Sequence, residues 1–196
     1  MSNFKLKSLN TIKLLAILFV AGLSFTACSD DHDHDDHDHE GEVITTFTYT
    51  LTNTTNNADV VTLTFEDLDG EGGQSGTYTI SGPLTANATY NGAVELLNKT
   101  VPSTDDEYNI TNEVKEESDE HEFFYSSSIA GITITKTDKD SKNNPLGVET
   151  TVATGAAGTG TLTALLKHEP TKPNDGTAAG AGGSTDIEVV FNITVQ

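Results

Sequence analysis

The feature that most constrains the fold of this chain is a regular alternation of apolar and polar residues in several short segments. Residues 47–52 read Phe-Thr-Tyr-Thr-Leu-Thr within a candidate strand at 43–52, and the final segment, 186–196, alternates in the same way. A period of two residues is typical of a β-strand with one buried face. We therefore predict a chain built mainly from strands that pack by one face.

Other segments share this pattern or are rich in β-branched and aromatic residues, with turn-forming residues between them. Strands are expected at about 61–65, 76–81, 88–98, 121–127, 129–137, 148–154 and 160–168. The predicted fold class is all-β: an immunoglobulin-like β-sandwich of about seven to nine strands with at most one short helix.

Two segments depart from the strand pattern. Residues 110–120 lack alternation, and Ile110 and Val114 are one helical turn apart, so a short helix is predicted there. Residues 171–185 are rich in Gly, Ala and Pro, which predicts a long exposed loop before the last strand.

Residues 1–27 have the features of a cleaved signal peptide. Three lysines precede an uncharged run over 14–27, which is shorter than the roughly 20 apolar residues that a spanning helix needs. The run ends Leu-Ser-Phe-Thr-Ala before Cys28, the only cysteine, and this junction resembles a bacterial lipobox. We expect cleavage before Cys28 and lipidation of its thiol, which would anchor the mature protein to a membrane.

The charge of the chain limits its partners. It contains 30 Asp and Glu residues, no arginine, and a formal net charge of −20. Such a surface repels nucleic acid and attracts divalent cations. We therefore expect no nucleic-acid partner. Because the only cysteine is predicted to carry lipid, the folded part must be stable without an intramolecular disulfide.

The segment 28–42 is predicted to be a disordered tether, because residues 29–42 include no apolar side chain. Its four histidines lie among carboxylates. Imidazole and carboxylate groups are both good ligands for zinc and other divalent metals. The candidate ligands are His32, His34, His37, His39, Asp33 and Asp38. Alternatively, the tract is only an export signal and a charged spacer.

The predicted domain, residues 43–196, contains a possible calcium loop. Asp67, Asp69 and Glu71 place carboxylates on alternate residues, and a glycine follows Asp69 where a calcium loop turns. The distal glutamate of an EF-hand is missing. An acidic turn between two strands is therefore the alternative.

Histidine and glutamate mark two further positions. Glu113, Glu117 and His121 are spaced four residues apart, and a Glu/His pair at this spacing on a helix can hold a transition metal. His168 shares its strand face with Leu166 and is the only other histidine outside the tether. Convergence of His121 and His168 would favour a metal site. A solvated acidic face and an ordinary strand-end histidine are the alternatives.

Three segments, Leu63–Gly70, Glu120–Tyr125 and Leu166–Pro170, resemble a family of small flavobacterial-type Bacteroidota surface lipoproteins of unknown function. The Ser-Asp-Asp that follows Cys28 resembles the export signal of such lipoproteins, which implies lipid anchoring at the outer membrane, facing the cell surface. Family members are often labelled as having a type 1 periplasmic-binding fold. That fold needs long helices between its strands, so the residue pattern favours the sandwich instead.

These features together predict an outer-membrane surface lipoprotein that binds or buffers a divalent metal, with zinc expected, and assists a TonB-dependent receptor. The alternative is a surface-displayed immunoglobulin-like module that binds a protein or glycan, with the tract serving export and spacing. The sequence lacks a nucleophile elbow, a Walker loop and a His-Glu-x-x-His motif. We therefore do not expect an enzyme.

Overall fold

The structure is a computed structural model that describes residues 42–69 and 75–196. The predicted signal peptide, Cys28 and the metal ligands of the histidine tract lie outside the described residues, as does Glu71 of the possible calcium loop. None of the helices in the described ranges is long and apolar enough to cross a membrane.

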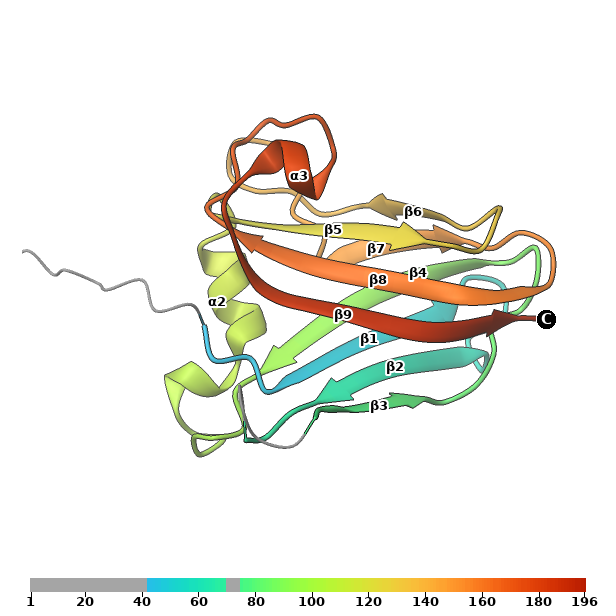
Figure 1. The fold of residues 1–196 in the computed structure, drawn as a ribbon, viewed down its shortest axis with the longest axis horizontal. Helices are drawn as coiled ribbons and strands as arrows, with labels where there is room; N and C mark the ends of the chain where they lie inside the picture. Colours follow the sequence, from blue (N-terminus) through green and yellow to red (C-terminus); the bar gives the residue numbers. More distant parts are fainter. Residues whose placement is uncertain (1–41, 70–74) are drawn as a thin grey trace, which may run out of the picture. The chain divides into compact units, whose positions relative to one another are not determined.

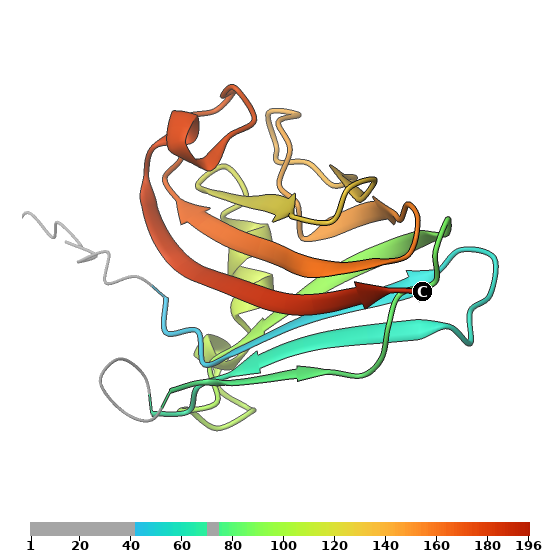
Figure 2. The same ribbon diagram turned by 45° about the vertical axis from the view of Figure 1, so that its right-hand side comes forward.

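The described chain forms two antiparallel sheets that pack face to face (Figures 1 and 2). One sheet contains β1 (Thr46–Asn53), β2 (Val60–Glu66), β3 (Thr77–Ile80), β4 (Thr89–Leu97), β6 (Thr133–Lys136) and β7 (Glu149–Ala153), in the order β3-β2-β1-β4-β7-β6. The other contains β5 (His121–Ser127), β8 (Gly158–His168) and β9 (Ser184–Val195), in the order β5-β8-β9. The predicted all-β sandwich is confirmed.

One short helix, α2 (Ile110–Glu116), lies at the end of the sandwich where β5 begins (Figure 1). Asn109 caps it by accepting a hydrogen bond from the backbone N–H of Asn112. Ile110 and Val114 are buried, as their helical spacing predicts. A single 3₁₀ turn, η1 (Asp106–Tyr108), precedes the helix.

Two segments differ from the sequence-based prediction. The expected strand at 129–137 is reduced to β6, because Gly131 has a φ of +87° and takes part in a turn before the strand. The expected loop at 171–185 contains a helical turn, α3 (Ala178–Ala181). It forms because the Thr177 hydroxyl accepts a hydrogen bond from the N–H of Gly180, while Ala181 is buried.

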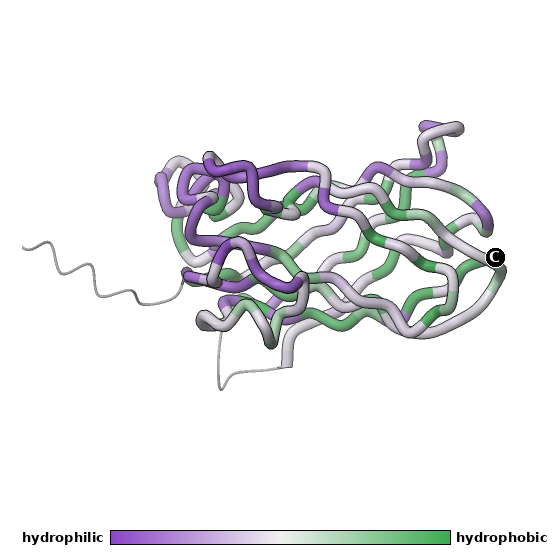
Figure 3. The backbone as a smooth tube through the Cα atoms, turned by 90° about the horizontal axis from the view of Figure 1, so that it is seen from above, coloured by the Kyte–Doolittle hydropathy of each residue, from purple (hydrophilic) through white to green (hydrophobic). Residues whose placement is uncertain are grey.

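The apolar core lies between the two sheets and follows the period-two pattern. The Phe47 ring from one sheet contacts Phe123 and Phe191 from the other, with ring centroids 6.3 Å and 5.9 Å away. Figure 3 shows that hydrophobic stretches run along the strands, while hydrophilic stretches gather mainly at the end away from the C-terminus. The helix α2 and the start of β5 lie at this polar end.

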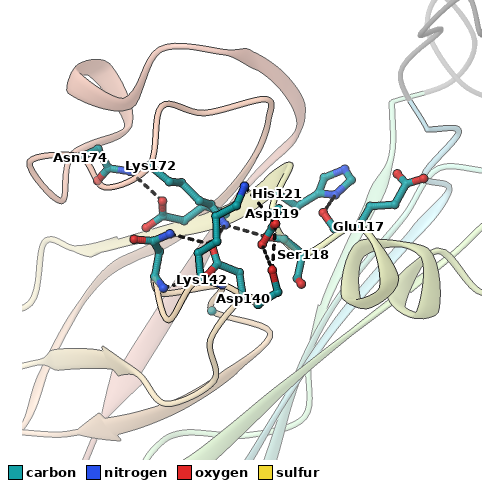
Figure 4. A network of polar contacts seen from close by, with 12 residues as sticks. Glu117, Ser118, Asp119, His121, Asp140, Lys142, Lys172 and Asn174 are labelled. Carbon is teal, nitrogen blue, oxygen red and sulfur yellow. Dashed lines mark hydrogen bonds and ion pairs between the residues drawn. The ribbon is translucent and has the colours of Figure 1, made fainter.

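A buried ion pair fastens the segment after β8 to the rest of the domain (Figure 4). The Lys172 ammonium lies 3.3 Å from Asp140 Oδ2 and donates to the carbonyl of Ser118 at 2.7 Å. The two charged side chains are 5% and 0% exposed. Because Asp140 lies after β6 and Ser118 lies between α2 and β5, this pair connects three segments that are distant in sequence.

The replacement Lys172→Ala is expected to lower the free energy of unfolding by about 3–5 kcal/mol, because it leaves the Asp140 carboxylate buried without its cation. Urea unfolding followed by circular dichroism measures this loss. Lys142→Ala is the control: Lys142 pairs with Asp119 but is 72% exposed, so its loss should cost about 0–1 kcal/mol. Equal effects of the two replacements would contradict the role of the buried pair.

Candidate metal centre

The two histidines outside the tract meet at the polar end of the core. His121 is the first residue of β5, His168 is the last residue of β8, and the two are directly opposite in the antiparallel register. His121 is two residues from Phe123 and His168 is two residues from Leu166, so each histidine shares the inward strand face of a buried apolar residue. His168 Nδ1 lies 3.1 Å from His121 Nε2. The convergence that would favour a metal site is therefore present.

The His121 ring is oriented by the C-terminal end of α2. Its Nδ1 lies 3.1 Å from the backbone carbonyl oxygen of Glu117, as the dashed line in Figure 4 shows. With the Nδ1 proton donated to that carbonyl, Nε2 presents its lone pair to the cluster. Metal-binding histidines are commonly oriented by such a contact. The His121 side chain is 0% exposed, so its position is fixed by packing.

Glu42 supplies the first carboxylate, from the segment that leads into β1. Its Oε1 lies 2.7 Å from His121 Nε2, and its side chain is only 7% exposed. Its second oxygen, Oε2, is buried and makes no hydrogen bond within the described residues. A carboxylate so withdrawn from water is costly unless a cation compensates it.

Asp186 supplies the second carboxylate because of an irregularity in β9. The register between β8 and β9 shifts between Leu166 and Lys167, whose partners are Ile187 and Thr185. Asp186 is the extra residue between those partners, and such bulges redirect a side chain. Its carboxylate is 2% exposed, with Oδ2 3.9 Å from His121 Nε2 and no hydrogen bond to Oδ2 in the described chain.

These four residues could hold a metal ion. Each offers one ligand atom, and the four atoms lie within 4.8 Å of one another. Two imidazole nitrogens and two carboxylate oxygens form a ligand set that zinc and related ions accept, and four ligands match the usual coordination number of zinc.

The cluster places negative charge and a nitrogen lone pair together in a buried space, so it needs a cation. In the metal-free protein a proton supplies this charge. Burial lowers the pKa of His121, but the hydrogen bond to Glu42 and the charges of Glu42 and Asp186 outweigh it, so the pKa is raised. Burial and the charge of Glu42 raise the pKa of Asp186 to about 6. The site thus retains protons that a metal ion could replace.

The other predicted ligands lie around this cluster. The helix ends at Glu116, so Glu117 and His121 are not on one helix face, and the Glu117 carboxylate groups instead with Glu42 and Glu113. Burial and the charges of Glu42 and Glu117 raise the pKa of Glu113. His168 also has Glu120 and Glu169 as neighbouring candidate ligands.

The possible calcium loop remains a prediction. Asp67 and Asp69 lie in the connection that follows β2, and the N–H of Asp67 donates to the carbonyl of Thr45. Glu71 is outside the described residues.

Sequence reasoning missed Glu42 and Asp186. Glu42 falls at the end of the predicted tether, because residues 29–42 include no apolar side chain, yet its carboxylate is buried. Asp186 has the parity of Glu188, which is exposed, and only the bulge turns it inward. The position of Glu42 directly before an alternating segment is the one sequence signal that could have identified it.

For the metal-free protein, we expect the free energy of unfolding to fall as the pH rises from about 5 to about 8. The stabilisation by protonated His121 is complete below its unfolded pKa of about 6.5 and is lost as the pH rises through the higher folded pKa. The folded pKa of Asp186 is about 6, against an ordinary value of 3.8. The stabilisation by its protonated form is therefore lost as the pH rises between these two values. Thermal unfolding in EDTA measures this trend.

The replacement Asp186→Asn is the control for this pH dependence. It removes the titrating carboxylate while keeping the side-chain size, so it should flatten the change in melting temperature between about pH 4 and 6. Stability that rises across this interval in the unsubstituted protein would contradict the assigned proton-holding cluster.

Comparison with known proteins gives no family for this chain. No family model, no curated protein and no solved structure matches it.

Proposed function

We propose that this protein binds a divalent transition-metal ion through Glu42, His121, His168 and Asp186, and that zinc is the physiological ion. The observation that carries this proposal is the convergence of four ligand atoms within 4.8 Å of one another, around a buried histidine whose Nε2 lies 2.7 Å from a carboxylate oxygen. Such a group is unfavourable without a positive charge, and a metal ion supplies that charge at neutral pH.

The ligand types support zinc over calcium or magnesium. Calcium and magnesium prefer oxygen ligands, whereas half of this set is imidazole nitrogen. His121 also has the orienting backbone contact that fixes a ring nitrogen for metal binding. Copper and nickel accept similar ligands, so the proposal for zinc depends on the four-ligand arrangement and is tested by competition.

The proposed setting for this activity is the outer membrane. Lipid on Cys28 would anchor the chain, and the acidic residues after it would direct display at the cell surface. The histidine tract ends at His39, three residues before Glu42 in the sequence. We assign the tract a weaker and less selective metal-binding role, since a flexible segment loses entropy when it binds. A TonB-dependent receptor is the proposed recipient of the metal.

Zinc calorimetry on the chain from Ser29 onward tests the proposal, because the buried apolar core of the described residues lies within 47–195. The tract ligands are silenced by H32A, H34A, H37A and H39A in one protein. This tract-silenced protein should still bind one zinc ion tightly at neutral pH. Adding His168→Gln and Asp186→Asn should weaken that binding by more than about 100-fold, since loss of a ligand should exceed the 10- to 100-fold cost of outer-shell changes.

Circular dichroism of each variant shows whether it is folded, so loss of binding is not confused with loss of structure. Competition with copper and nickel then ranks the metals. Zinc binding that disappears when only the tract is silenced would overturn the domain site and leave the tract as the sole metal binder. No zinc binding in any variant would favour the interaction-module function.

A further inference from the structure

A second group of ligand atoms adjoins the proposed zinc site. Glu42, Glu113 and Glu117 each offer a carboxylate oxygen, and these oxygens lie within 4.8 Å of one another. Glu113 lies in α2 and Glu117 is its C-terminal capping residue. Glu42 belongs to this group and to the group with the two histidines, so it is the one residue shared between them.

Both carboxylate oxygens of Glu42 are buried. Oε1 lies 2.7 Å from His121 Nε2, and Oε2 makes no hydrogen bond within the described ranges. The side chain is more than nine-tenths buried, at 7% exposure. An ordinary solvated acidic face does not explain a carboxylate that is withdrawn from water in this way.

In the part of the chain that the structure describes, no lysine forms an ion pair with Glu42, Glu113 or Glu117. Lys115, on α2, pairs with Glu149 at 3.8 Å, and Lys172 is held by Asp140 and the carbonyl of Ser118. Carboxylates of like charge repel one another at this separation, and a divalent cation would convert the repulsion into attraction. Two metals a few ångströms apart are a known arrangement in proteins.

We propose that Glu42 bridges two metal ions, and that Glu113 and Glu117 complete a second site for an oxygen-preferring divalent cation beside the zinc site. This inference rests on the proposed function, because the bridge requires an ion on the histidine side. Three carboxylates without imidazole favour a harder cation than zinc, such as manganese, magnesium or calcium. Glu117 is exposed, which leaves this second ion open to water.

Manganese is the probe, because its EPR signal separates free from bound ion. The tract-silenced protein is first loaded with one equivalent of zinc and then titrated with Mn²⁺. We expect one bound Mn²⁺ per chain with the zinc retained. The double replacement E113Q and E117Q should weaken Mn²⁺ binding at least tenfold and leave zinc affinity unchanged. Because it removes repelling charges, it should not destabilise the metal-free fold.

Glu116→Gln is the matched control, since Glu116 lies on the same helix, is exposed and belongs to neither ligand group. It should leave Mn²⁺ binding unchanged. Zinc binding without Mn²⁺ binding, displacement of zinc by Mn²⁺, or Mn²⁺ binding that survives E113Q and E117Q would overturn the second site alone. Failure to bind zinc in the loading step would instead overturn the proposed function.

Discussion

The antiparallel register of β5, β8 and β9 is the constraint on which the rest of this structure depends. Pairing of β5 with β8 places His121 opposite His168, and the shifted register between β8 and β9 turns Asp186 toward them. The same strands present Phe123, Leu166 and other apolar side chains to the core. The inward faces of these strands therefore supply both the apolar core and the polar cluster, which follow one another along the strands.

A polar cluster at the end of an apolar core lowers the stability of the fold unless its charges are compensated. Glu42 and Asp186 lose most of their hydration, because their side chains are only 7% and 2% exposed. Domains have small net stability, so a site of this kind is sensitive to whichever cation occupies it. Protons and a metal ion would compete for the same lone pairs, so the proposed metal binding would be coupled to pH.

The strand that carries His121 is covered on both faces. Its inward face packs in the core, while Glu122 on the other face pairs with Lys136 and accepts a hydrogen bond from Asn174. The Lys172–Asp140 pair holds the segment that contributes Asn174. Together these contacts limit movement of β5, so the position of the His121 ring is determined from both sides of the sheet.

The sequence by itself determined the fold class and one part of the site. Alternation of apolar and polar residues establishes which strand face is buried, and that parity already directs His168 inward alongside Leu166. Only the tertiary structure decided which other side chains each ligand residue contacts. Each ligand meets a residue that is distant in the sequence. His121 pairs with His168, the bulge at Asp186 arises from the pairing of β9 with β8, and Glu42 is buried against His121. Local patterns determine which way a side chain points, whereas strand register determines what it meets.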